Sequence, residues 1–316
     1  MIQIKRNNFV FLLISKINIK LLITLICFAF IGNSIYGNFD SLSNQTIGKK
    51  EILWLLGGIL FSFLSIIINA YAWKLLINNI GFNSNKLNII KIFLATNIYK
   101  YLPGGIWHFV SRFNTLRLDL STEKALESVL LEPLLMLVAG LIFVPFSGYS
   151  IAIFMICWSS ALVFLPVFRK FLIKKMKAIK ANFFTKIDHL NDRKLVKNNQ
   201  NISTKMFYPY KALFVEIIFI LFRFLGFLCC INAFSIGSLI SHGQLISSFS
   251  LAWIIGLIVP AAPGGLGVFE SVILFSLGSH LPEASLLASL LFYRLISTIS
   301  DICAALIYPV KKLFKV

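Results

Sequence analysis

The sequence lacks the motifs that ATP-driven and metal-dependent proteins carry. It contains no GxxxxGK[ST] phosphate loop, no HExxH and no cysteine pairs at metal-ligand spacing. Its five cysteines all fall inside apolar runs, where we interpret them as core residues. Charged residues are scarce, at 13% of the chain, and no segment has room for a soluble domain. We therefore expect no nucleotide hydrolysis, no metal and no cofactor.

Hydrophobic residues are abundant instead, at 58% of the chain, with 14% aromatic residues. This composition lies far from the globular average and predicts an all-α polytopic membrane protein. The net charge of +18 comes mostly from Lys and Arg beside apolar runs. At such positions positive charge sets membrane topology and contacts anionic lipid, so we expect membrane lipids as partners and no nucleic acid.

A Pro-Gly-Gly phrase occurs twice, first in YKYLPGGIWH (99–108) and again in PAAPGGLGVFE (260–270). Proline removes an amide donor and glycine relaxes the backbone, so each phrase is expected to interrupt a helix. Pro103, Gly104 and Gly105 precede Pro263, Gly264 and Gly265 by 160 residues. The same offset relates Phe109 to Phe269 and Glu123 to Glu283. Paired interruptions at corresponding positions point to the binding site of a transporter built from repeats.

Six apolar stretches predict full membrane spans, at about 21–31, 52–77, 121–144, 149–168, 212–231 and 283–309. The interrupted segment 89–110 has positive charges on both flanks, whereas segment 245–277 has none. We expect two re-entrant hairpins that enter from opposite faces and form an inverted repeat, with both termini in the cytoplasm. A kinked full span is the alternative for 89–110.

The chain divides into four parts of a single membrane domain (1–316). These are an N-terminal helix and loop (1–50), a first repeat half (51–168), a basic connector (169–211) and a second repeat half (212–316). The connector carries twelve Lys or Arg and two Asp. It is too short for a nucleotide-binding or transferase domain, which needs at least about 100 residues, so we interpret it as a cytoplasmic link that touches anionic headgroups.

The two Pro-Gly-Gly phrases, with Arg112 and Tyr293-Arg294, resemble the flippase-like integral membrane family that includes the transmembrane region of lysylphosphatidylglycerol synthases. The resemblance covers about 52–308. It implies an inverted-repeat membrane domain that moves or holds a lipid or lipid-linked glycan. The soluble aminoacyl-transferase domain of the synthases is missing from these 316 residues, so the synthase activity is not carried over.

Charged side chains inside apolar spans are costly and are expected to face the protein interior. Glu216 and Arg223 lie seven residues apart on one span, and Arg294 and Asp301 lie seven apart on another, which puts each acid and base on one helix face. One interpretation is that these are buried pairs that fix helix register. The other is that Arg223 and Arg294 attract a lipid phosphate.

In the second interpretation, Glu132, Glu270 and Asp301 balance the arginine charge or bind a cationic headgroup. The amides of the two Pro-Gly-Gly tips either bind phosphate or form packing corners where only glycine fits. His108 either gates a proton-coupled step or is structural, and Lys100 and Tyr101 are placed to contact headgroups. The candidate substrate-binding set is Pro103, Gly104, Gly105, His108, Arg112, Glu132, Arg223, Pro263, Gly264, Gly265, Glu270, Arg294 and Asp301.

The function expected from these features is a lipid or lipid-linked glycan flippase of the cytoplasmic membrane. One alternative is an intramembrane transferase with a lipid-linked donor, in which Glu132 or His108 acts as base. Another is a scaffold that binds anionic lipid through the connector. A separate lipid-synthesising enzyme is a plausible partner of a flippase.

Overall fold

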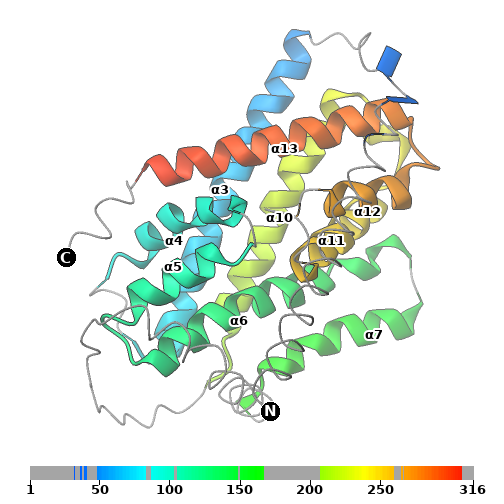
Figure 1. Ribbon diagram of the computed structural model, residues 1–316. Coiled ribbons are helices and arrows are strands. Elements are labelled where there is room, and N and C mark those ends of the chain that lie inside the picture. Colours follow the sequence, from blue (N-terminus) through cyan, green and yellow to red (C-terminus); the bar gives the residue numbers. More distant parts are fainter. Residues whose placement is uncertain are drawn as a thin grey trace, which may run out of the picture.

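The structure, a computed structural model, describes residues 48–82, 87–102, 105–148, 150–166, 207–259, 265 and 267–307, with a few isolated positions between 32 and 40. All regular elements in these ranges are helices (Figure 1). The predicted span 21–31 and most of the predicted connector, 169–206, lie outside the described residues. So do the first two residues of each Pro-Gly-Gly phrase.

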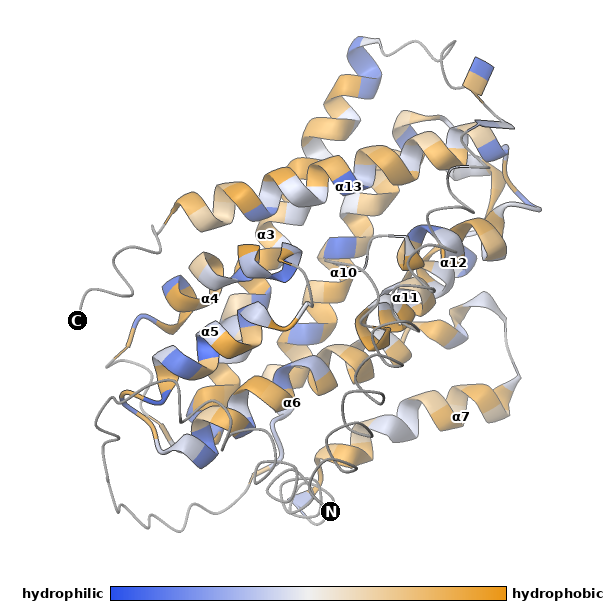
Figure 2. Ribbon diagram, viewed as in Figure 1, coloured by the Kyte–Doolittle hydropathy of each residue, from blue (hydrophilic) through white to orange (hydrophobic). Residues whose placement is uncertain are grey.

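Four helices are long and apolar enough to cross a membrane. They are α3 (Lys49–Asn79), α6 (Thr122–Leu141), α10 (Tyr210–Ala233) and α13 (Glu283–Leu306), and the 3-10 turn η3 (Val144–Ser147) extends α6 to an apolar segment of 26 residues. About 20 helical residues cross the hydrocarbon core. Apolar residues dominate these helices in Figure 2. The prediction of an all-α membrane protein with several spans is confirmed.

The predicted span 149–168 is shorter than expected within the described residues. Helix α7 (Ile151–Ser159) continues only as the 3-10 turn η4 (Ser160–Phe164). Leu165 then adopts an extended backbone, with ψ 144°. Proline disfavours a helical conformation in the residue before it, so Pro166 accounts for the early end of this helix.

Each Pro-Gly-Gly phrase lies between two short helical stretches. The first follows α4 (Ile89–Asn97) and the turn η2 (Ile98–Tyr101), and α5 (Trp107–Leu116) comes after it. The second lies between α11 (His242–Ile258) and α12 (Val268–Leu277).

The backbone at the two phrases follows from their prolines and glycines. Leu102 and Val259 are extended, with ψ 146° and 99°, as expected for residues that precede Pro103 and Pro260. Gly105 and Gly265 have φ +66° and +70°, a left-handed conformation that glycine adopts without strain. The last glycines of the two phrases therefore share the same left-handed backbone conformation.

The 160-residue offset also relates the helices of the two halves. Adding 160 to the first residues of α3, α5 and α6 (49, 107 and 122) gives 209, 267 and 282, and α10, α12 and α13 begin at 210, 268 and 283. Adding 160 to the last residue of α4 gives 257, and α11 ends at 258. The second half thus repeats the helix order of the first, with these helix ends in the same register.

Equivalent long helices run in opposite directions. Gly57 of α3 lies beside Cys229 of α10, and the ring of Phe61 lies 5.9 Å from that of Phe222. Residue numbers rise along one helix as they fall along the other, so α3 and α10 are antiparallel. Helices α6 and α13 also run in opposite directions in Figure 1.

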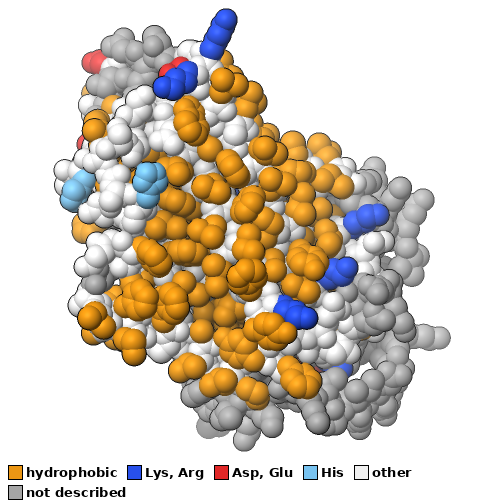
Figure 3. Space-filling view, turned by 180° about the vertical axis from the view of Figure 1, so that it is seen from behind, with side chains coloured by type: hydrophobic (Ala, Val, Ile, Leu, Met, Phe, Trp, Pro, Cys, Tyr) orange, Lys and Arg blue, Asp and Glu red, His pale blue; other side chains and the backbone are white. Residues whose placement is uncertain are grey.

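One hydrophobic core joins both halves. Its buried members include Trp73 and Phe93 from the first half and Phe227, Phe249 and Tyr293 from the second. The outer surface is also apolar, because α7 and many other helical positions expose large hydrophobic side chains. Figure 3 shows one face covered by such side chains with few charged ones. A surface of this kind suits contact with hydrocarbon rather than water.

Candidate functional site

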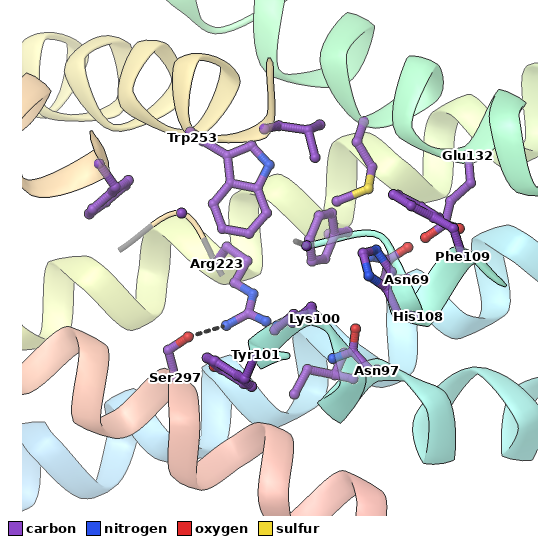
Figure 4. Close-up of a pocket in the computed structure, with 18 of the residues that line it drawn as sticks. Asn69, Asn97, Lys100, Tyr101, His108, Phe109, Glu132, Arg223, Trp253 and Ser297 are labelled. Carbon is purple, nitrogen blue, oxygen red and sulfur yellow. Dashed lines mark hydrogen bonds between the residues drawn. The ribbon is translucent and has the colours of Figure 1, made fainter. Parts of the chain in front are cut away.

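A cavity of about 230 Å³ lies between the two halves. Both halves contribute to it symmetrically, because four pairs of lining residues are related by the 160-residue offset. These pairs are Phe93 with Trp253, Asn97 with Leu257, Gly105 with Gly265, and Phe109 with Phe269. Figure 4 shows several of the lining side chains pointing into this space. The two interrupted segments therefore meet at one central site.

An ion pair between Arg112 and Glu132 joins α5 to α6. One Arg112 nitrogen donates to both Glu132 oxygens, at 2.8 and 2.6 Å, and Nε donates to Thr96 Oγ1 at 3.2 Å. The guanidinium also lies 3.7 Å from the centre of the Phe93 ring. Both charged residues are almost fully buried, at 1% and 3% exposure. This pair holds the helix after the first Pro-Gly-Gly phrase against the following span.

In the second half, an ion pair between Glu270 and Arg294 holds the short helix α12 against the span α13. Glu270 also accepts a hydrogen bond from the backbone amide of Gly267, so it caps the first turn of α12. Arg294 additionally donates to the backbone oxygen of Gly265 at 2.9 Å. These two side chains fix the end of the second Pro-Gly-Gly phrase.

The two ion pairs have opposite polarity. In the first half the arginine is on the short helix and the glutamate on the span, whereas in the second half the glutamate is on the short helix and the arginine on the span. The positions nearly correspond, since 112 and 132 plus 160 give 272 and 292, two residues from 270 and 294. The two halves thus use the same kind of contact with the charges exchanged.

Asp301 of α13 organises a third cluster, which crosses between the halves. Its Oδ1 accepts from Asn97 at 2.8 Å, and its Oδ2 accepts from Tyr101 at 2.6 Å and lies 2.7 Å from Lys100 Nζ. An Arg223 nitrogen of α10 lies 3.7 Å from Oδ1. Three donors thus lie within hydrogen-bond distance of Asp301, and Arg223 adds an ion-pair contact. Two cations therefore share this carboxylate.

Arg223 is held at the centre of the cavity. One guanidinium nitrogen donates to Ser297 Oγ at 3.1 Å, as the dashed line in Figure 4 shows. Its Nε is buried and has no hydrogen-bond partner within the described part of the chain. The guanidinium lies 5.6 Å from the centre of the Trp253 ring. Arg223 thus presents an unused donor among the lining side chains.

A comparison with family models matches residues 17–305 to the lysylphosphatidylglycerol synthase TM region. That match covers nearly the whole chain. The chain belongs to the lysylphosphatidylglycerol synthase TM-region family. A comparison with curated proteins gave no match.

In this member of the TM-region family, seven of the thirteen candidate residues line the central cavity: Gly105, His108, Arg112, Glu132, Arg223, Gly265 and Arg294. Glu270 and Asp301 lie behind the wall, where each contacts a lining cation. Pro103, Gly104, Pro263 and Gly264 lie outside the described residues. The Nδ1 atom of His108 is buried without a hydrogen-bond partner in the described ranges.

The charged pairs expected within single helices are not formed. Arg223 contacts Asp301 and Ser297 rather than Glu216, and Arg294 contacts Glu270 rather than Asp301. Seven residues of helix rise about 10.5 Å, which is too far for direct contact. Glu216 is buried, and neither of its carboxylate oxygens has a hydrogen-bond partner in the described residues.

Several polar or aromatic lining residues were not predicted from the sequence, among them Asn69, Asn97 and Trp253. Trp253 had a usable signal, because the 160-residue offset pairs it with Phe93, which lies just before the first interruption. Asn69 and Asn97 are uncharged polar residues in apolar segments, and their type alone gives no sign of which neighbour they meet.

Proposed function

We propose that the protein is a flippase of the cytoplasmic membrane that moves the headgroup of a lipid or lipid-linked glycan. The observation that carries this proposal is the cavity between the two halves, which brings Gly105 and Gly265 together with the cations Lys100, Arg223 and Arg294. A polar site between repeats allows a headgroup to cross while the acyl chains stay in lipid. Membership of the lysylphosphatidylglycerol synthase TM-region family supports a lipid-related role.

The membrane arrangement in this proposal is an inverted repeat in which the interrupted segments are re-entrant hairpins from opposite faces. The antiparallel course of α3 and α10 supports it, because equivalent helices of an inverted repeat cross the membrane in opposite directions. Cysteine labelling in intact cells tests it. A cysteine at Ser241 should react with an impermeant reagent and one at Asn199 should not, and the reverse pattern refutes the arrangement.

Transport is favoured over the alternative of an intramembrane transferase with Glu132 as base. Both Glu132 oxygens accept hydrogen bonds from Arg112. A general base needs an acceptor within reach of the proton it removes, and here the positive charge of Arg112 competes for both oxygens. Glu132 is therefore better suited to hold α5 against α6 than to accept a proton from a substrate.

A flipping assay in vesicles tests the proposed function. The purified protein is reconstituted with fluorescent phospholipids in both leaflets, and dithionite then quenches only the outer leaflet. Active protein should raise the quenched fraction above one half. Arg294→Ala with Glu270→Gln should lose this activity, whereas Lys211→Gln, an exposed position at the start of α10, should keep it. Quenching no greater than in empty vesicles, across phospholipid and glycolipid probes, refutes the proposal.

A further inference from the structure

Part of the cavity wall exposes cations whose carboxylate partners lie behind the wall. Lys100, Arg223 and Arg294 line the cavity, whereas the carboxylates that contact them, Asp301 and Glu270, do not. A molecule inside the cavity therefore meets the cations first. The part of the wall that these three cations form therefore attracts anions.

The imbalance is concentrated at Lys100 and Arg223. Arg112 and Arg294 each have a glutamate of their own, but Lys100 and Arg223 share the single carboxylate of Asp301. Asp301 is also fully buried and accepts from the neutral side chains of Asn97 and Tyr101. One positive charge in this group is thus left without a matching negative charge.

A second observation on Arg223 also indicates a missing ligand. Only 2% of Arg223 is exposed, and its Nε donor has no hydrogen-bond partner within the residues that the structure describes. Buried donors are nearly always hydrogen-bonded, and an unsatisfied guanidinium donor is especially costly. Figure 4 shows the guanidinium among the side chains that line the cavity, with Trp253 on one side and Ser297 on the other.

We propose that Arg223 and Lys100 form a binding subsite for the phosphate group of a lipid headgroup. This inference rests on the proposed function and names the chemical group that the central site recognises. Arginine suits phosphate because its donors are arranged as a fork, and Lys100, with 22% of its side chain exposed, adds a second charge at the cavity surface. The phosphate charge matches the unpaired positive charge.

The size and remaining wall of the cavity indicate the rest of the headgroup. A volume of about 230 Å³ lies below the range of about 300–1,000 Å³ found for drug-sized ligands. It suits a phosphate with a small substituent such as glycerol rather than an oligosaccharide. The aromatic walls of Phe93, Phe219 and Trp253 can pack against the uncharged part of that substituent.

Equilibrium binding by native mass spectrometry in detergent tests the subsite with three matched probes. Dioctanoyl phosphatidylglycerol has both the phosphate and the acyl chains, dioctanoylglycerol lacks the phosphate, and glycerol 3-phosphate lacks the chains. The wild-type protein should bind the first at least tenfold more tightly than the other two. Equal affinity for the first two overturns the phosphate site without any variant, and equal affinity for glycerol 3-phosphate overturns its assignment to a lipid.

Variants locate the subsite. Arg223→Gln and Lys100→Gln should each weaken binding of dioctanoyl phosphatidylglycerol by about 10- to 100-fold, the loss of one charge-assisted contact. Arg223→Lys should recover part of the affinity, and Lys211→Gln on the same helix should bind like the wild type. Gel filtration and thermal unfolding establish that each variant is folded. A folded Arg223→Gln protein with wild-type affinity overturns the proposal.

The two assays distinguish a failure of the subsite proposal from a failure of the transport proposal. Loss of phosphatidylglycerol binding in Arg223→Gln, without flipping by the wild type, supports the subsite and refutes the transport function. Flipping by the wild type, with undiminished binding and flipping in Arg223→Gln, refutes the subsite and leaves the transport function standing.

Discussion

Removing the charge of Glu132 should destabilise the protein by about 3 kcal/mol. Arg112 donates twice to Glu132 and is 1% exposed, so Glu132→Gln leaves a buried guanidinium without its counter-charge. Breaking a buried ion pair by removing one partner typically costs about 3–5 kcal/mol. We expect the lower end, because the glutamine oxygen still accepts one hydrogen bond from Arg112. The hydrogen bond of Arg112 to Thr96 and its contact with the Phe93 ring also remain.

Replacing both partners should restore most of the stability. In Arg112→Met with Glu132→Leu neither charge is left buried alone, and exchange of a buried pair for apolar residues of similar volume is often neutral or stabilising. The Thr96 hydroxyl keeps its donor role, because it bonds to the backbone oxygen of Ile92 at 2.7 Å. We expect the double variant within about 1 kcal/mol of the wild type.

Equilibrium unfolding by SDS in mixed micelles, followed by tryptophan fluorescence, measures both effects. The expected loss for Glu132→Gln corresponds to roughly a hundredfold change in the unfolding equilibrium. Trp73 lies 5.3 Å from the Arg112 guanidinium and reports on this region directly. A loss below about 1 kcal/mol for Glu132→Gln, or a double variant as unstable as Glu132→Gln, would show that the pair does not hold α5 against α6.

Three further predictions test other parts of the structure. Gly58→Ala should cost about 1–3 kcal/mol in the same SDS titration, because an added Cβ lies 3.1 Å from Ile296 and 3.3 Å from a backbone oxygen of α10. Its neighbour Gly57→Ala should be tolerated, since the nearest atom lies at 3.7 Å. Arg294→Lys should raise the rate of amide hydrogen exchange in the first turn of α12. Lysine lacks the forked donors with which Arg294 contacts both Glu270 and the backbone oxygen of Gly265. An unchanged exchange rate would contradict this role. Glu216→Gln should stay within about 1 kcal/mol of the wild type, because no described residue donates to its carboxylate; a loss like that of Glu132→Gln would reveal a partner.

The sequence revealed features that depend on local chemistry. Proline and glycine act on the backbone where they stand, so the two interruptions, at Pro103 and near Pro260, could be placed from the letters alone. The 160-residue offset also identified equivalent helices, because each half must repeat the same apolar spans. Burial of Glu132 and Arg223 followed from the cost of charge in a membrane span, whereas Arg112, which the sequence placed on the flank of segment 89–110, is buried as well.

The sequence did not reveal which charges meet. The seven-residue spacing of Glu216 and Arg223 describes one helix, whereas the actual contacts join different helices, and Lys100 meets Asp301 across 201 residues. Such partners depend on helix crossing, which spacing along one helix does not encode. The exchanged polarity of the two Arg–Glu pairs could not be predicted from the repeat either, because the residues of the second pair lie two positions away from the 160-residue register.

The wide separation of Asp301 from Lys100 along the sequence has a consequence for biosynthesis. Arg112 and Glu132 are synthesised close together, so their pair can form early. Lys100 and Arg223 must wait for α13, and at about 5–20 residues per second the ribosome needs roughly 10–40 s to advance from Lys100 to Asp301. A nascent chain therefore holds two cations in the membrane without their carboxylate until its last described helix is inserted. The cavity wall is therefore completed only when α13 joins the helices that were made before it.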